Sequence, residues 1–376
     1  MKIIVLGGDG FCGWPTALKL AREEHQVLIL DNLSRRLIDE ELKTNSLTDI
    51  ASIETRVSTA QNHAMDIECK RVDLRHYESV VSEFNDFQPD AVVHFAEQRS
   101  APYSMIGSKE RRFTVENNIC VTHNILNAIV ECKPDIHLVH LGTMGVYGYS
   151  KDFGSIPEGY LNIKINSTEK DADILYPTQP GSVYHMTKSL DQLLFQFYVK
   201  NWGIKITDLH QGIVWGTQTE ETMLAPELIN RFDYDGVFGT VLNRFIVQAA
   251  NDHPISVYGT GGQKRAFIHI SDTAKCVQLA IENPPYGEQI KTRIFNQVSE
   301  VRQVKELAFM CGGKEIEFLS NPRKELSENE LEVSNEGLKS LGFEPVLLSE
   351  ELMNDVSFIA KQGKFNKETV LTSPNW

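Results

Sequence analysis

The sequence begins MKIIVLGGDGFCGWPTALKLA over residues 1–21, and this stretch predicts how the chain starts to fold. The apolar run 2–6 is short enough for a buried strand, and it ends at the spaced glycines Gly7, Gly10 and Gly13. Apolar residues then recur at helical spacing. A strand, a glycine turn and a helix in this order are typical of a site where the backbone closely approaches a dinucleotide pyrophosphate at the helix N-terminus.

A carboxylate stands where such a site needs one. Residues 26–30 form a second predicted strand, and Asp31 follows it directly. Its side chain can accept both adenosine-ribose hydroxyls and would repel a 2′-phosphate, which favours NAD over NADP. Arg35 and Arg36 come shortly afterwards and keep NADP open. A glycine-rich turn without a ligand is the remaining alternative.

Strands and helices alternate through the first half of the chain. Further strands are predicted at 67–72, 91–96, 136–141 and 204–209. A long helix is expected over 109–132, and an extra helix near 46–57 in the connection after Asp31. The alternation predicts an α/β protein with a Rossmann-type doubly wound parallel sheet, whose ligands bind at the carboxyl ends of the strands.

The alternation loosens after about residue 212. We therefore expect a NAD-binding Rossmann domain over 1–212 and a smaller mixed α/β domain for the substrate over 213–376, allowing for one return of the chain to the first sheet.

Composition excludes several classes of partner. The net charge of −14 argues against nucleic acid or an anionic membrane as the main partner. No apolar run is long enough to span a bilayer. Because the first strand begins at once, we expect no targeting segment. The six cysteines show neither a C-x-x-C pair nor metal-ligand spacing, which predicts reduced thiols, no metal site and a cytoplasmic location.

A tyrosine and a lysine point to acid–base chemistry. Tyr184 and Lys188 are four residues apart and so share one face of a predicted helix. A neighbouring ammonium favours the phenolate, so we expect a lowered pKa for Tyr184 and a role as a base. Thr143, just after the predicted strand 136–141, can hydrogen-bond the same substrate hydroxyl. A solvated helix face is the alternative, because this spacing is common by chance.

Together these motifs resemble the extended short-chain dehydrogenase/reductase superfamily, which contains NAD-dependent nucleotide-sugar epimerases and dehydratases. The resemblance implies that Thr143, Tyr184 and Lys188 are catalytic, and that Lys188 also holds the nicotinamide ribose. It implies a homodimer paired through the helices near 109–132 and 184–202. The expected cofactor-binding residues are Gly7, Gly10, Phe11, Cys12, Gly13, Asp31, Asn32, Arg35, Arg36, Asp73, Leu74, Phe95, Asn118, Tyr184 and Lys188.

Longer stretches are more specific. They are HFAEQRSAPYS at 94–104, LGTMG at 141–145, RFDYDGVFGT at 231–240 and LNRF at 242–245. These resemble the UDP-sulfoquinovose synthase family, which makes UDP-sulfoquinovose from UDP-glucose and sulfite. The resemblance implies oxidation at sugar carbon 4 with NAD, loss of water across carbons 5 and 6, sulfite addition at carbon 6 and re-reduction at carbon 4. Val146 departs from the family, which often has Glu there, so an acid assigned to this position would be missing.

The residues after Thr143 bear on the elimination step. Met144 and Gly145 stand where dehydratases of the superfamily typically place Asp and Glu. Two carboxylates beside carbon 6 would repel sulfite, whereas small neutral residues leave room for it. The alternative is that this pair marks a UDP-glucose 4-epimerase, which also lacks the two acids.

Two further residues are candidates for the sulfite chemistry. Arg99 could hold a sulfite or sulfonate oxygen, and His185 could shuttle a proton at carbon 5 or 6. The alternatives are that Arg99 pairs with an acid and that His185 is a packed helix residue.

A bound UDP group needs cations for its diphosphate and polar side chains for further hydrogen bonds. The resemblance places Arg265 and Arg323 on the UDP diphosphate. The full set of expected substrate-binding residues is Arg99, Gln98, Gln211, Asn243, Gln263, Arg265 and Arg323. Arg231 and Arg244 are either further contacts or structural ion pairs. Two other functions remain open: a UDP-glucose 4-epimerase or 4,6-dehydratase-type enzyme, and a non-catalytic NAD-binding regulator, which would not need the Thr–Tyr–Lys trio.

Overall fold

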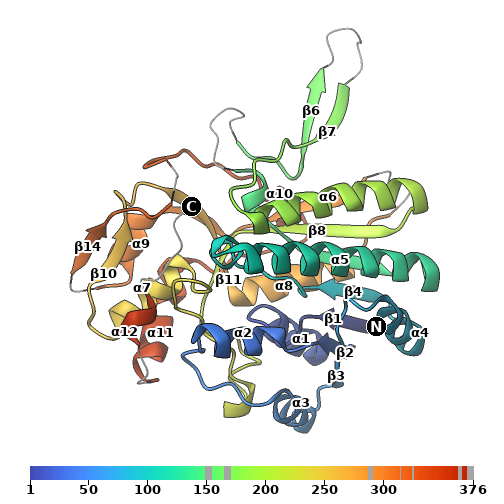
Figure 1. The fold of residues 1–376 in the computed structure, drawn as a ribbon, viewed down its shortest axis with the longest axis horizontal. Coiled ribbons are helices and arrows are strands. Elements are labelled where there is room, and N and C mark those ends of the chain that lie inside the picture. The colour runs from blue at the N-terminus through green and yellow to red at the C-terminus, as the bar shows by residue number, and fades with distance from the viewer. Residues whose placement is uncertain are drawn as a thin grey trace.

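The computed structural model describes residues 1–148, 155–164, 171–286, 291–313, 315–323, 326–362 and 366–370. At its centre is a seven-stranded sheet in the order β12-β8-β5-β4-β1-β2-β3 (Figure 1). Its strands are β1 (Lys2–Leu6), β2 (Gln26–Asp31), β3 (Ile67–Arg71), β4 (Ala91–His94), β5 (His137–Thr143), β8 (Lys205–Gln211) and β12 (Arg293–Gln297). All neighbours are parallel, and the strand order reverses between β1 and β4. The predicted doubly wound sheet is therefore confirmed.

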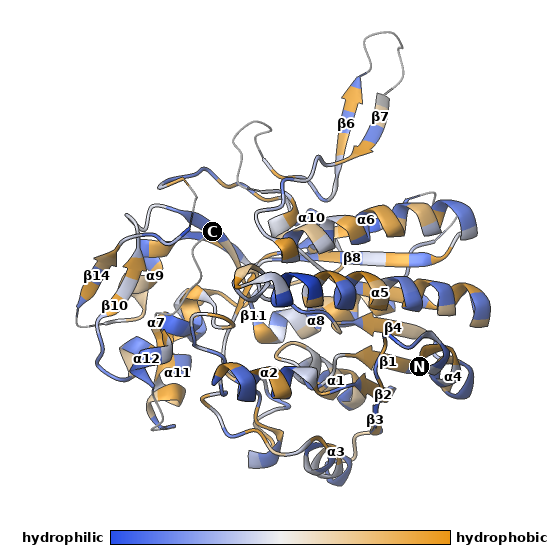
Figure 2. Cartoon of the chain, in the orientation of Figure 1, coloured by the Kyte–Doolittle hydropathy of each residue, from blue (hydrophilic) through white to orange (hydrophobic). Residues whose placement is uncertain are grey.

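The central strands are apolar on both faces because helices cover both faces. Along β1, Ile3 and Val5 pack on one side of the sheet, and Ile4 and Leu6 on the other. The apolar character of β1 and β4 is visible in Figure 2. Helices α1 (Gly13–Arg22), α3 (Ile53–Asn62) and α8 (Ile270–Glu282) contribute to the first side, and α4 (Tyr77–Phe87), α5 (Ser108–Cys132) and α6 (Val183–Trp202) to the second.

The connection after Asp31 differs from the prediction. The helix expected near 46–57 is wrong in place, because the connection contains α2 (Ser34–Leu42) and, later, α3. Helix α2 ends where Lys43 takes a left-handed conformation, with φ of 56°. Helix α3 begins after Ser52, whose side chain accepts a hydrogen bond from the Thr55 N–H. Local capping therefore sets both boundaries.

The rest of the chain builds smaller sheets beside the central one. The order β13-β11-β9 joins Glu300–Gln303, Lys264–His269 and Ile213–Trp215, and β10 (Ile255–Tyr258) pairs with β14 (Ile316–Leu319). The remaining helices are α7 (Val241–Ala250), α9 (Val304–Met310), α10 (Glu336–Ser340), α11 (Leu348–Ala360) and α12 (Lys367–Val370). Short 3-10 helices lie at Tyr103–Met105, Met144–Val146 and Pro226–Leu228. A hairpin of β6 (Tyr160–Lys164) and β7 (Asp171–Leu175) extends away from the body (Figure 1).

The chain does return to the first sheet. Helix α8 packs against α1, and β12 pairs with β8. The second half thus supplies an edge strand of the central sheet, while the division into domains at residues 212 and 213 stays a prediction. Among the described residues, no helix combines the length and apolar character needed to cross a bilayer.

Glycines let three backbone segments meet at the carboxyl edge of the sheet. A Cβ atom at Gly7 would lie 2.8 Å from the backbone of Ala96, and one at Gly13 would overlap the Gly7 carbonyl oxygen. The turn after β1, the start of α1 and the loop after β4 are therefore in direct contact. This contact leaves backbone, rather than side chains, lining the place where phosphates would bind.

Replacing Gly13 by alanine should destabilise the protein by about 1–3 kcal/mol, because the clashing neighbours are backbone atoms that cannot rotate away. Urea unfolding measures the change. Gly181→Ala is the matched control, since its added Cβ would meet only His185 Nδ1, at 3.9 Å. Equal stability of the Gly13 variant and the wild type would contradict the close packing.

Candidate active site

Two adjoining pockets open at the carboxyl ends of the central strands. The first pocket is bordered by the loops after β1, β2, β3 and β4, and the second by the loop after β5, the start of α6 and residues 237–241. They share seven lining residues: Phe11, Cys12, Arg99, Gly142, Tyr184, Gln211 and Phe238. Ligands in the two pockets would therefore meet beside Tyr184.

Most of the predicted cofactor-binding residues line the first pocket: Gly7, Gly10, Phe11, Cys12, Gly13, Asp31, Asn32, Arg35, Asp73, Leu74, Phe95, Tyr184 and Lys188. Arg36 and Asn118 are not among the lining residues. Arg36 donates two hydrogen bonds to Asp9, at 2.6 and 2.8 Å. Asn118 is fully buried, accepts the Gln98 N–H and donates to Thr187 Oγ1. It therefore holds the loop after β4 in place.

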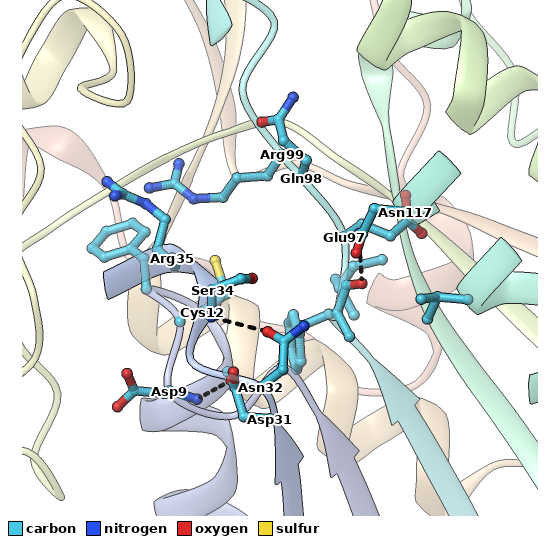
Figure 3. A pocket seen from close by; sticks show the side chains of 18 of the residues that line it. Asp9, Cys12, Asp31, Asn32, Ser34, Arg35, Glu97, Gln98, Arg99 and Asn117 are labelled. Atoms are coloured by element: carbon cyan, nitrogen blue, oxygen red, sulfur yellow. Dashed lines mark hydrogen bonds between the residues drawn. The ribbon is translucent and has the colours of Figure 1, made fainter. Parts of the chain in front are cut away.

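Asp31 is anchored where β2 ends. One carboxylate oxygen accepts the backbone N–H group of Asp9 at 3.0 Å, as Figure 3 shows, and the other accepts that of Leu33 at 2.8 Å. Each oxygen keeps a further lone pair for a ribose hydroxyl. Burial, followed by the charge of Asp9, raises the pKa of Asp31.

The two arginines that kept NADP open are both engaged. Arg36 binds Asp9, whereas Arg35 pairs with Asp39 and Asp233 and stacks 3.5 Å from the Phe238 ring centroid. Neither guanidinium is free for a 2′-phosphate. The glycine cradle and the anchored Asp31 therefore fit NAD.

The Thr–Tyr–Lys trio comes together between the pockets. Thr143 ends β5, and Tyr184 and Lys188 lie in the first turns of α6, whose N-cap is Ser182. Burial raises the pKa of Tyr184, and Lys188 and a hydrogen bond with Thr143 lower it only in part. The expected lowering of this pKa by Lys188 is therefore wrong for the protein without ligands.

Burial is the main cause of this raised pKa, and the carboxylate of Glu97 adds to it. Glu97 Oε1 lies 2.8 Å from Lys188 Nζ and 2.9 Å from His140 Nε2. Lys188 also donates to the Leu141 carbonyl at 2.6 Å. His94, Glu97 and His140 are close enough together to hold a metal ion, but the Lys188 ammonium already supplies a positive charge there.

A buried chain of polar groups continues behind the site. His140 Nδ1 lies 2.8 Å from Asp208 Oδ1, and the other oxygen of Asp208 lies 2.9 Å from His210. His210 Nδ1 is 2.7 Å from the Tyr147 hydroxyl. His94, His140 and Asp208 occupy matching positions on neighbouring strands. Polar residues in register within apolar strands are the signal that could have revealed this group.

The second pocket collects the remaining candidates. Its lining includes Thr143, Met144, Gly145, Tyr184, His185, Arg99, Gln211, Gln263, Arg265 and Arg323. Gln98 instead borders the first pocket, where its side chain folds the loop through Ser100 and Thr114. Asn243 lines neither pocket, because its buried amide donates to the Asp233 carbonyl. A substrate role for these two residues stays a prediction.

Arg231 and Arg244, whose roles the sequence leaves open, have different surroundings. Arg231 is buried in ion pairs with Asp39 and Asp233, which is a structural role, although it also borders the first pocket. Arg244 lines the second pocket, with its guanidinium 5.1 Å from the Tyr258 ring centroid. Arg244 is therefore the one placed to meet a substrate.

Arg99 and His185, the two candidates for the sulfite chemistry, both line the second pocket, and each contacts another side chain. Arg99 borders both pockets and pairs with Asp233 at 2.5 Å, so its alternative, an ion pair with an acid, is present in the structure. His185 Nδ1 lies 3.1 Å from Ser182 Oγ, and its ring packs against Gly145. Burial and Arg323 lower the pKa of His185 to about 4, which leaves a neutral ring at pH 7.

The pH dependence of stability should report the buried chain. Burial and Lys188 oppose a charge on His140, but Asp208 and Glu97 raise its pKa to about 9. A pKa raised above the unfolded value of 6.5 stabilises the fold fully below pH 6.5, and this contribution is lost as pH rises through 9. His140→Gln should therefore lose more stability at pH 6 than at pH 10, by up to about 3 kcal/mol in urea unfolding. A pH-independent difference would contradict a charged His140.

Comparisons with known proteins agree with this geometry. Residues 3–296 match the model of the NAD dependent epimerase/dehydratase family. The chain is 44% identical to the chloroplastic UDP-sulfoquinovose synthase of Spinacia oleracea, over 100% of this chain and 79% of that protein. It is 40% identical to the UDP-sulfoquinovose synthase of Sulfolobus acidocaldarius, over 96% and 92%.

Solved structures share the fold. The UDP-glucose 4-epimerase of Thermotoga maritima, solved with UDP-glucose, superposes with a TM-score of 0.72 at 21% identity, covering 97% of this chain and 100% of that one. The UDP-glucuronic acid 4-epimerase of Bacillus cereus, solved with UDP-glucuronic acid and NAD, gives a TM-score of 0.68 at 22% identity, covering 96% and 99%. The chain belongs to the NAD-dependent epimerase/dehydratase family and, within it, to the UDP-sulfoquinovose synthase family.

Proposed function

We propose that this protein is an NAD-dependent UDP-sulfoquinovose synthase, which converts UDP-glucose and sulfite to UDP-sulfoquinovose. One observation carries the choice of reaction within the family. Among the described residues, the second pocket is lined by four arginines and by no aspartate or glutamate: Arg99, Arg244, Arg265 and Arg323. Such a lining suits both a diphosphate and an anionic second substrate.

Acid–base work at sugar carbon 4 falls to the trio. NAD, when bound, accepts a hydride from carbon 4 and returns it at the end of the cycle. Tyr184 takes the proton of the carbon 4 hydroxyl, and Thr143 hydrogen-bonds the same oxygen. Lys188, fixed by Glu97 and the Leu141 carbonyl, orients the cofactor's ribose.

The chemistry at carbons 5 and 6 uses neutral and cationic groups. Met144 and Gly145 border the pocket without charge, and Val146 is buried, so no acid stands at that position. The neutral ring of His185 can accept a proton from carbon 5 and return it. Arg99, at the junction of the pockets, is the cation for sulfite once its bond to Asp233 is exchanged for the anion. Because residues 144–146 are neutral, sulfite meets none of the repulsion that carboxylates at these positions would cause.

A homodimer is the expected assembly. Helix α6 exposes Met186, Leu190, Leu193 and Phe197 at helical spacing, with Leu193 59% and Phe197 55% accessible. A second copy of this helix would cover such a stripe. Light scattering of the purified protein should give twice the monomer mass, and a monomer would refute this. A cytoplasmic location stays a prediction; all six cysteines are free thiols.

The reaction is tested directly by mass spectrometry. UDP-glucose with sulfite should yield a UDP-sugar in which a sulfonate replaces the carbon 6 hydroxyl. Without sulfite, solvent deuterium should enter at carbon 5 while net product stays near zero. Arg99→Ala should lower sulfite use far more than NAD binding. Conversion of UDP-glucose to UDP-galactose at full rate, with sulfite ignored, would instead identify a 4-epimerase.

Arg265 and Arg323 should bind the UDP diphosphate. A charged hydrogen bond contributes about 1.5–3 kcal/mol, so alanine at either position should weaken UDP binding by roughly 10- to 150-fold in calorimetry. Arg302→Ala is the matched control, because Arg302 pairs with Glu300 and lines neither pocket. Unchanged UDP affinity in both pocket variants would place the nucleotide elsewhere.

A further inference from the structure

Glu97 is a buried carboxylate that the proposed reaction leaves without a role. It follows β4, and its side chain is only 2% exposed. Its Oε1 atom is shared by Lys188 Nζ at 2.8 Å, His140 Nε2 at 2.9 Å and His94 Nε2 at 3.4 Å. Figure 3 shows Glu97 across the first pocket from Arg35 and Arg99. A carboxylate that accepts from a lysine and a histidine at these distances, out of water, is held firmly in place.

The charges around Lys188 nearly cancel. Lys188 and His140 are positive, and Glu97 and Asp208 are negative. Burial lowers the pKa of His94 to about 3, so this ring is neutral.

The remaining groups that face the cluster come from α6, β8 and the loop after β4. Asp191, on α6, lies 3.8 Å from His140, and burial raises the pKa of its carboxyl group. His210 reaches the cluster only through Asp208. The charge of Arg99 also acts on Tyr184, and Arg99 is paired with Asp233. Among the described groups, the positive charge of Lys188 is therefore paired with Glu97, and that of His140 with Asp208.

This balance changes what Lys188 does for Tyr184. An unpaired ammonium near a phenol favours the phenolate, whereas an ammonium 2.8 Å from a carboxylate has a much weaker field beyond the pair. A bound oxidised NAD would add a positive charge at this site, which would favour the phenolate form of Tyr184.

We propose that Glu97 is a positioning residue that holds the Lys188 ammonium in a buried ion pair and thereby weakens the support that Lys188 gives to the phenolate of Tyr184. The inference deepens the proposed function and rests on its order of steps. At the first step the O–H bond at carbon 4 breaks and the Tyr184 O–H bond forms. Tyr184 keeps this proton through elimination and sulfite addition, and then returns it to the carbon 4 oxygen when that carbon is reduced.

The test is the titration of Tyr184 in the purified full-length protein. Tyrosinate absorbance is followed against pH, and the Tyr184 signal is the difference between each protein and the same protein carrying Tyr184→Phe. Glu97→Gln removes the negative charge, so Tyr184 should titrate about one pH unit lower than in the wild type. Glu97→Asp keeps the charge and should titrate near the wild type. This measurement needs no substrate. The titration can therefore contradict the role of Glu97 while the proposed function stands, and the proposed function can fail while the titration agrees with that role.

A variant of opposite sign protects the test against misfolding. Lys188→Met removes the positive charge beside Tyr184, so it should shift the Tyr184 titration upward. Asp355→Asn is the matched control, because Asp355 is buried, binds Thr217 and lines neither pocket; it should cause no shift. Where Glu97→Gln folds, the acid limb of its turnover profile should move to lower pH by the same amount. Unchanged titration of Tyr184 in both cluster variants, or a shift with Asp355→Asn as large as theirs, overturns the proposal.

Discussion

Close backbone contact at the carboxyl edge of the central sheet is the constraint on which the rest of the structure depends. Gly7 touches Ala96, and Gly13 touches Gly7, with no room for a Cβ atom at either glycine. Gly142 repeats the pattern on β5, where a Cβ would lie 2.5 Å from Asp208 Oδ1. Because of these contacts, the two pockets adjoin and share lining residues, and the buried chain of polar groups lies directly behind them.

A second feature of the site is that charged side chains pair with side chains of opposite charge. Aspartates pair with the arginines in and around the first pocket. Asp9 binds Arg36 and Arg56, and Asp233 binds Arg35 and Arg99. Glu97 does the same for Lys188. The second pocket is different, because its described lining has arginines and no carboxylate. The arginines of the second pocket thus lie where anionic substrates are expected to bind.

Patterns that depend on neighbours in sequence could be predicted. The glycine turn, Asp31, the Tyr–Lys pair and the order of strands all follow local periodicity and spacing, and the structure places them as expected. Features that depend on contacts across the fold could not. The pairing of Glu97 with Lys188 joins residues far apart in sequence, and the shift of the predicted helix at 46–57 came from a cap at Ser52 and a left-handed Lys43.

The tyrosine shows why the second kind matters. Spacing alone gives Tyr184 an activating lysine, but burial and Glu97 reverse the direction of its pKa shift. Asn118 and Asn243 illustrate the same limit, since the sequence did not predict that their amides hydrogen-bond backbone groups of Gln98 and Asp233. A residue type in the right stretch does not establish which way its side chain points.

The central claim is that two ligands meet at Tyr184 from adjoining pockets. A crystal structure of the protein with NAD and UDP-glucose tests it most directly. The account predicts the dinucleotide along Gly7–Gly13 and Asp31, the diphosphate within hydrogen-bond distance of Arg265 and Arg323, and the carbon 4 hydroxyl against Tyr184 and Thr143. A sugar bound with carbon 4 away from Tyr184, or a diphosphate that touches neither arginine, would contradict it.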